Sequence, residues 1–259
     1  MPVVPSWPIS SSAPTIGAEA PASSLPRRAN GKIRALVFEP DNVLYDASHW
    51  QRWLWQLLSR LGIQRDFAGF RRIWQRGYLV EAHRGTRDFT DAFRAFLADW
   101  GLSAGQINEV EAASNAKRRE AFQNVRPLPG VVKTLATLNE SRITLAALAN
   151  SELSANELRD RINRLGLGGR FQTVLSSRDL GCVKPTPNCY QAVLDALRFA
   201  PESVLYVGCL ADELSGASAI GLRTAAVNAD PDALADHHCQ RFDDLVSLCL
   251  PKQPAAMAS

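Results

Sequence analysis

The sequence has few of the features that would place it outside ordinary globular proteins. Its five cysteines are odd in number and form no C-x-x-C pair, which favours reduced thiols over a disulfide framework. No apolar run approaches the roughly 18–20 residues that are needed to cross a bilayer. The net charge of +3 is too small to indicate a nucleic-acid-binding protein. We therefore expect a cytoplasmic protein that binds neither membranes nor nucleic acid.

The composition is that of a folded chain with two poorly folding ends. Hydrophobic residues make up 46% of the sequence and charged residues 21%, which suits a large globular domain or a core with an inserted lobe. Residues 1–30 are rich in Pro, Ser and Ala and lack the apolar stretch of a secretory signal, so they predict a disordered leader. Residues 251–259 predict a disordered tail of similar composition.

Apolar runs alternate with helical patterns through most of the chain. This order predicts an α/β fold with a Rossmann-like, doubly wound parallel sheet, whose core comprises residues 31–46 and 126–250. We expect strands at 35–38, 143–148, 171–176, 204–207 and, as the last strand, 224–227, with helices at 131–139, 157–165, 186–199 and 214–220.

An inserted helical region separates the first predicted strand from the rest of the core. Residues 47–125 have the period of amphipathic helices, with four helices expected at 49–60, 67–78, 89–100 and 106–123. Their aromatic stripes are interpreted as packing between helices rather than as a cofactor site.

Two acidic residues follow the first strand directly. Glu39 and Asp41 come after the apolar run 35–38, at the strand end that faces the ligand crevice in open α/β sheets. Because like charges repel, a site tolerates two carboxylates there if they share a cation or a proton. This stretch predicts a metal-phosphate loop.

Four motifs in order strengthen this interpretation. They are Val37-Phe-Glu-Pro-Asp-Asn-Val-Leu-Tyr-Asp46, the strand 145–151, Val183-Lys-Pro-Thr-Pro-Asn-Cys-Tyr190, and Val207-Gly-Cys-Leu-Ala-Asp-Glu-Leu-Ser-Gly-Ala217. Together they resemble the haloacid dehalogenase superfamily, in its phosphoglycolate-phosphatase-like branch, over about residues 32–248. The resemblance implies a HAD-like core with an α-helical cap domain inserted at 47–125.

The resemblance also implies roles for individual residues and a Mg²⁺ cofactor. In the family an Asp nucleophile carries the phosphoryl group, a second Asp two residues later is the acid/base, and a Ser/Thr and a Lys hold phosphate oxygens. Carried over, the catalytic residues are Glu39, Asp41 and Lys184; the phosphate-binding residues are Asn150, Ser151 and Lys184; and the metal-binding residues are Glu39, Asp41, Asp212 and Glu213.

Three positions depart from the phosphatase pattern. Glu39 replaces the nucleophilic Asp and is one methylene longer, and displacement of an attacking atom by about 1 Å can cost on the order of 100-fold in rate. Ala149 lacks the expected hydroxyl group. Cys209 offers a thiol where Mg²⁺ requires an oxygen ligand, and no neighbour in the sequence would activate it as a nucleophile.

Structural roles compete with functional ones at several of these positions. Asp41 could cap the following turn, and Asn150 could satisfy backbone groups of its loop. Cys209 could be a small buried residue that closes a strand, and Asp212 and Glu213 could be acids in the first turn of a helix.

Two further groups of residues are candidates outside the motifs. The adjacent residues His237, His238 and Cys239 cannot easily point at one metal ion and are interpreted as surface. Five basic residues of the inserted region could meet an anionic substrate or could form a solvated helix face: Arg71, Arg72, Arg76, His83 and Arg84.

The departures lead to two hypotheses about function. The first is a phosphatase-type fold whose phosphohydrolase activity is lost or severely weakened and which binds a small phosphorylated molecule or a protein partner. The alternative is an active Mg²⁺-dependent phosphatase acting on a small phosphate ester. A dehalogenase is a weaker third choice, because it too would need Asp as its nucleophile.

Overall fold

A six-stranded sheet forms the centre of the molecule in the computed structural model, which describes residues 31–250. The strand order is β3-β2-β1-β4-β5-β6, and every neighbouring pair is parallel. The strands are β1 (Ala35–Phe38), β2 (Thr144–Ala149), β3 (Phe171–Ser176), β4 (Val204–Gly208), β5 (Arg223–Val227) and β6 (His237–Cys239). The predicted doubly wound parallel sheet is confirmed.

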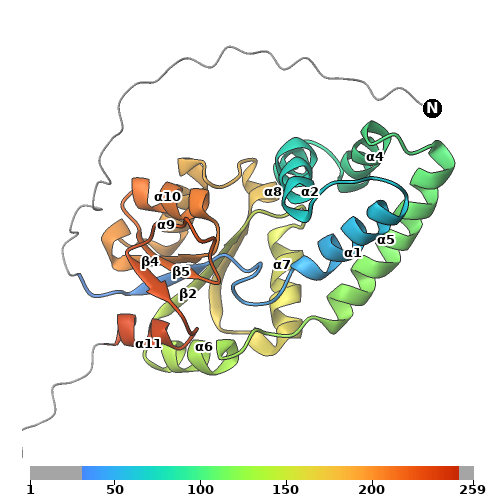
Figure 1. Cartoon of the computed structure of the whole chain (residues 1–259). Helices are drawn as coiled ribbons and strands as arrows, with labels where there is room; N and C mark the ends of the chain where they lie inside the picture. Colours follow the sequence, from blue (N-terminus) through green and yellow to red (C-terminus); the bar gives the residue numbers. More distant parts are fainter. Residues whose placement is uncertain (1–30, 251–259) are drawn as a thin grey trace, which may run out of the picture.

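Helices cover both faces of the sheet (Figure 1). Because strand side chains alternate, Leu36 and Phe38 of β1 lie in one hydrophobic cluster and Ala35 and Val37 in the other. The first face is covered by α6 (Val131–Glu140), α7 (Ala155–Ile162) and α11 (Asp244–Cys249), and the second by α9 (Pro187–Leu197) and α10 (Ala211–Ala219). The short helices α8 (Ser177–Leu180) and η3 (Pro201–Ser203) lie in connections.

The helical segment, residues 48–124, packs around a third hydrophobic cluster of its own. Trp74 is fully buried there and contacts Phe93 and Phe96 at ring-centroid distances of 5.7 and 5.1 Å. Its helices are α1 (Ser48–Arg60), α2 (Phe67–Ile73), η1 (Trp74–Leu79), α3 (Val80–His83), α4 (Phe89–Asp99) and α5 (Ala104–Asn124). These aromatic side chains therefore pack helix against helix.

Some sequence predictions need correction. The strand Arg223–Val227 is not the last one, because His237–Cys239 forms β6 at the sheet edge, where its residues are half-buried or exposed. The helix predicted at 67–78 runs on to His83 through the π-helical turn η1. Helix α10 begins at Ala211 rather than 214, so Asp212 and Glu213 lie in its first turn.

Two other predictions concern the ends of the chain and membrane-spanning helices. The predicted leader 1–30 and tail 251–259 lie outside the described residues. Within residues 31–250, the longest helices are too short or too polar to span a bilayer.

Candidate functional site

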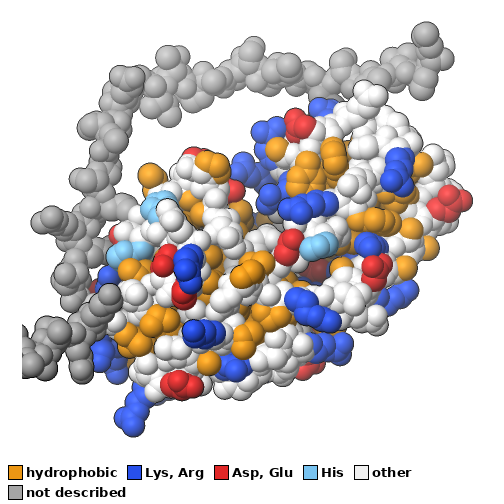
Figure 2. Space-filling model, turned by 60° about the horizontal axis from the view of Figure 1, so that its bottom comes forward, with side chains coloured by type: hydrophobic (Ala, Val, Ile, Leu, Met, Phe, Trp, Pro, Cys, Tyr) orange, Lys and Arg blue, Asp and Glu red, His pale blue; other side chains and the backbone are white. Residues whose placement is uncertain are grey.

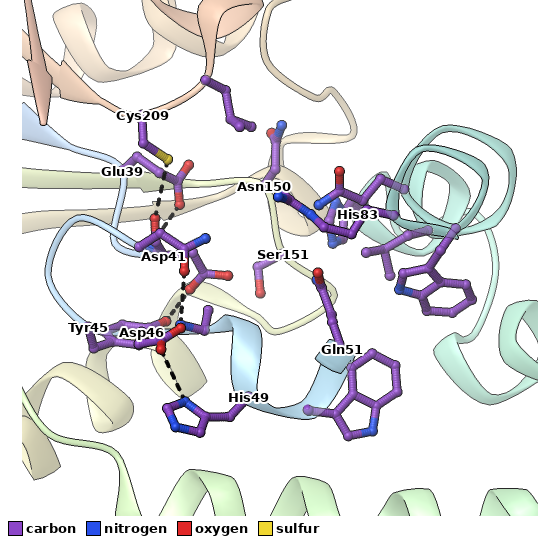
Figure 3. A pocket seen from close by; sticks show the side chains of 18 of the residues that line it. Glu39, Asp41, Tyr45, Asp46, His49, Gln51, His83, Asn150, Ser151 and Cys209 are labelled. Atoms are coloured by element: carbon purple, nitrogen blue, oxygen red, sulfur yellow. Dashed lines mark hydrogen bonds and ion pairs between the residues drawn. The ribbon is translucent and has the colours of Figure 1, made fainter. Parts of the chain in front are cut away.

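A cavity of about 1250 Å³ lies between the carboxyl ends of the strands and the helical segment. Its core side includes Glu39, Asn150, Lys184 and Glu213, which follow different strands. The carboxyl ends of parallel strands meet at one edge of a sheet, and this topology brings distant residues together. Figure 3 shows Glu39, Asp41, Asn150, Ser151 and Cys209 around the same space.

Lys184 is the centre of a buried polar cluster. Its side chain is 0% exposed and its Nζ forms an ion pair with Glu39 Oε2. The same Nζ lies 2.8 Å from Glu213 Oε2 and 3.0 Å from the Tyr206 hydroxyl oxygen. Tyr206 in turn donates a hydrogen bond of 2.8 Å to Glu213 Oε2. Every donor of this lysine therefore faces a partner within the protein.

Close packing and Asn150 position the loop that carries Lys184. A Cβ on Gly216 of α10 would lie 2.9 Å from the carbonyl oxygen of Pro185, so only glycine lets the helix approach this loop so closely. Asn150 accepts a hydrogen bond of 2.9 Å from the Lys184 backbone N–H and donates one of 3.1 Å to its carbonyl. Asn150 therefore satisfies loop backbone groups, the structural role considered for it.

Burial and neighbouring charges change the protonation of this cluster. Burial, together with the nearby carboxylate of Glu213, raises the pKa of Glu39 from 4.5 to about 8, against the opposing effect of Lys184. Burial lowers the pKa of Lys184, but Glu213 and Glu39 outweigh it, so the net shift is upward. The cluster thus holds a charged lysine, and Glu39 binds a proton more readily than an exposed glutamate does.

The raised pKa of Glu39 predicts a pH-dependent stability. The folded state binds this proton more tightly than the unfolded state, so the stabilisation is full below about pH 4.5 and is lost as pH rises through about 8. Glu39→Gln cannot titrate. We expect the melting temperature of the wild type to fall relative to that of Glu39→Gln between these two pH values. A difference that stays constant over this range, measured by calorimetry, would contradict the prediction.

Asp41 has a different set of partners from Glu39. Its Oδ1 accepts a hydrogen bond from the Tyr45 hydroxyl, and that hydroxyl also accepts one of 3.3 Å from Arg161 Nη1. The Asp41 backbone N–H donates a hydrogen bond of 3.1 Å to Glu39 Oε1. Figure 3 marks this bond with a dashed line. The two carboxylates predicted to share one cation are thus held by separate partners, Lys184 and Tyr45.

The remaining motif positions are also engaged in structure. The Ser151 hydroxyl accepts a hydrogen bond of 3.1 Å from the Leu153 backbone N–H, which stabilises the turn after β2. Ala149 is buried at the end of β2. Cys209 is buried directly after β4, and burial together with the charge of Glu39 raises the pKa of its thiol, which therefore stays protonated. These surroundings argue against a cysteine nucleophile.

The donor groups around this site do not fit the Mg²⁺ that the resemblance implies. Within residues 31–250 no group of three or more His, Cys, Asp or Glu side chains could hold a metal ion. The Lys184 ammonium lies against Glu39 and Glu213, where it competes with any cation, and Cys209 offers sulfur in place of oxygen. Asp212 Oδ1 accepts a hydrogen bond of 2.9 Å from the Glu213 backbone N–H. The four predicted metal ligands are therefore not gathered around one position.

Glu152 joins the helical segment to the core. This residue follows Ser151, and its carboxylate forms ion pairs with Arg118 of α5 and, at 3.7 Å, with His83 of α3. Burial opposes ionisation, but the hydrogen bond with His83 and the charge of Arg118 lower the pKa of Glu152 well below its usual range. Of the five basic residues that could meet an anionic substrate, His83 therefore contacts a core carboxylate instead. Arg84 does not line the cavity.

Sequence reasoning missed Tyr206, Tyr45, Arg161 and Glu152. Tyr206 is a polar side chain in a buried strand, and Tyr45 lies four residues after Asp41 in the first motif. Both tyrosines could have been found from the sequence, because a hydroxyl group in a buried segment needs a hydrogen-bond partner. Arg161 and Glu152 carry no such signal, since their partners come from other parts of the chain.

Comparison with known families decides the classification. The profile described as Haloacid dehalogenase-like hydrolase matches residues 88–227, more than half of the chain. The chain belongs to the haloacid dehalogenase-like hydrolase family. The match begins after the first motif, so it does not include Glu39 or Asp41.

Members of this family with curated functions show distant similarity to the chain. Glyceraldehyde 3-phosphate phosphatase of Methanopyrus kandleri is 26% identical over 202 residues, which cover 75% of this chain and 84% of that protein. Haloacetate dehalogenase H-2 of Moraxella sp. is 27% identical over 120 residues, 46% of this chain and 53% of that protein.

Solved structures of the family share the fold. The HAD-hydrolase YfnB of Bacillus subtilis, solved with bound magnesium, has a TM-score of 0.65 at 20% identity and covers 85% of this chain and 99% of its own. The L-2-haloacid dehalogenase RSc1362 has a TM-score of 0.65 at 21% identity, with coverage of 85% and 99%. At these identities the likeness concerns the fold.

Proposed function

We propose that this family member is of phosphatase type, with phosphohydrolase activity lost or severely weakened, and that its cleft binds a ligand without hydrolysing it. One observation carries the proposal: Lys184, the residue expected to neutralise a phosphate, is fully buried and paired with Glu39 and Glu213. A phosphate group would have to displace these pairs and then lie against the freed carboxylates, which would repel it.

The composition of the site supports the same proposal. The raised pKa makes Glu39 bind a proton more readily than an ordinary carboxylate, and its extra methylene displaces the attacking oxygen, so it is a poor nucleophile. Ala149 cannot hydrogen-bond a phosphate oxygen, which weakens phosphate binding by roughly 10- to 100-fold. Losses among residues that act together do not multiply, so no combined factor follows, but the changes at Glu39, Ala149 and Cys209 all act in the same direction.

The phosphatase type itself is supported by the curated relatives. Glyceraldehyde 3-phosphate phosphatase of Methanopyrus kandleri aligns over 84% of its own length, more than the 53% of the dehalogenase from Moraxella sp.. An active Mg²⁺-dependent phosphatase is the alternative function, and the assay below separates it from the proposed one.

The purified full-length protein is expected to leave p-nitrophenyl phosphate and small phosphate esters unhydrolysed in the presence of Mg²⁺. Released phosphate should equal that from the Glu39→Gln variant, because Glu39 is not acting as a nucleophile. Turnover by the wild type that disappears in Glu39→Gln would overturn the proposed function and establish the active phosphatase.

A further inference from the structure

Three arginines of the helical segment line the cavity without an acidic partner. The side chains are Arg71, Arg72 and Arg76, and within residues 31–250 none of them takes part in an ion pair or a side-chain hydrogen bond. The buried Nε of Arg71 is likewise without an acceptor in the described part of the chain. Figure 2 shows Lys and Arg side chains grouped in the upper middle of the face that it presents.

The arrangement of these arginines costs stability in the absence of a ligand. Arg72 and Arg76 are four residues apart across the junction of α2 and η1, and like charges at this spacing repel each other. Two other cations of the helical segment in the cavity are paired with acids, Arg118 with Glu152 and Lys117 with Glu120, whereas Arg126 donates to the Val125 carbonyl oxygen. An anion bound between the free arginines would remove the repulsion and supply the missing acceptors.

The core side of the cavity has the opposite charge. Asp212, Asp230 and Asp232 line it, Lys184 is already paired with Glu39 and Glu213, and Arg161 donates to the Tyr45 hydroxyl. The field between an acidic core and a basic helical segment would turn the anionic group of a ligand toward α2 and away from the strand ends. Such an anion would therefore not occupy the position that the reaction of a phosphatase requires.

Aromatic side chains complete the wall on the helical side. The cavity lining includes Trp50, Trp74, Phe89 and Phe122. Trp74 is fully buried and offers no surface to a ligand, so the wall consists of the half-buried Trp50, Phe89 and Phe122. The Arg118 guanidinium lies over the Phe89 ring at 3.7 Å. Aromatic walls with a few polar groups are typical of sites for small molecules that carry a ring.

We infer that the helical segment holds a small aromatic phosphomonoester, with its dianionic group on Arg71, Arg72 and Arg76 and its ring against the aromatic wall. The absence of hydrolysis on this ligand rests on the proposed function. The position of the anionic group does not, because it follows from the free arginines and the acidic core.

Calorimetric titration of the full-length protein with phenyl phosphate tests the inference. The triple variant Arg71→Gln, Arg72→Gln, Arg76→Gln should bind it at least about tenfold more weakly, since charge-assisted hydrogen bonds are removed. A matched control changes Arg60, Arg65 and Arg119 to Gln; these exposed arginines of the helical segment lie outside the cavity lining and alter the net charge equally. Its affinity should equal that of the wild type.

A second ligand and a replacement variant complete the test. Inorganic phosphate, which lacks the ring, should bind more weakly than phenyl phosphate. If the triple variant does not fold, Arg72→Gln with Arg76→Gln replaces it, because both residues are exposed. Equal loss of affinity in the test and control variants, or no binding of millimolar phenyl phosphate by the wild type, overturns the inference. Phosphate release during titration overturns the proposed function alone, provided that the arginine variant still loses affinity.

Discussion

Lys184→Met is expected to destabilise the protein more than any other single change in the site. Methionine fills a similar volume but leaves Glu39 and Glu213 buried without a cation. Removal of one partner from a buried ion pair costs about 3–5 kcal/mol, which for a chain of this size lowers the melting temperature by roughly 6–20 °C. Calorimetric unfolding at neutral pH measures the effect.

Two variants separate this effect from general consequences of losing a lysine. Lys117→Met removes a partly exposed lysine whose partner Glu120 is 59% exposed, so it should cost less than about 1 kcal/mol. Adding Glu39→Gln and Glu213→Gln to Lys184→Met should recover part of the loss, since no charge then remains buried. If Lys184→Met melts at the wild-type temperature, the lysine is not paired as the structure shows.

Restoration of three side chains is expected to produce phosphatase activity. Glu39→Asp shortens the carboxylate by one methylene and withdraws it from Lys184, Ala149→Ser returns a hydroxyl group, and Cys209→Asp supplies an oxygen ligand for Mg²⁺. We expect Mg²⁺-dependent hydrolysis of p-nitrophenyl phosphate at least on the order of 100-fold above the wild type, because misplacement of the nucleophile alone costs about that factor.

The control for this experiment removes the acid/base residue. The same triple variant carrying Asp41→Asn should return to the wild-type background, since the Asp41 carboxylate would have no replacement as proton donor. A triple variant that folds and binds Mg²⁺ but stays inactive would mean that the site differs from a working phosphatase beyond these three positions.

Sequence pattern predicted the fold well because a parallel sheet buried on both faces leaves continuous apolar runs between helical periods. The strand Phe171–Ser176 agrees with its predicted bounds, and all five predicted strands are present. The strand His237–Cys239 was missed because a short, half-exposed edge strand with two histidines carries no such run. The π-helical turn η1 is likewise invisible to a period of 3.6 residues.

The positions of Glu39, Asn150, Lys184 and Glu213 around one cavity follow from sequence, because each lies in the connection after a different strand. Glu39 and Asn150 come directly after β1 and β2, Lys184 comes after α8, and Glu213 lies in the first turn of α10. Their partners do not follow from sequence. Glu39 and Lys184 are 145 residues apart, and nothing in the local sequence shows that their charged groups meet. The roles implied by the family resemblance stay predictions for these residues.

The chain order of apolar runs, turns and strand-end polar residues determines the family, the sheet and the place of the site, because these depend on local burial. Tertiary structure alone decides how charges in that site are compensated, because ion pairing depends on distances between side chains far apart in sequence. It pairs Lys184 with Glu39 and Glu213 and leaves Arg71, Arg72 and Arg76 without acids within the described chain. This difference between a paired lysine and free arginines decides which ligand group each side of the cavity can bind.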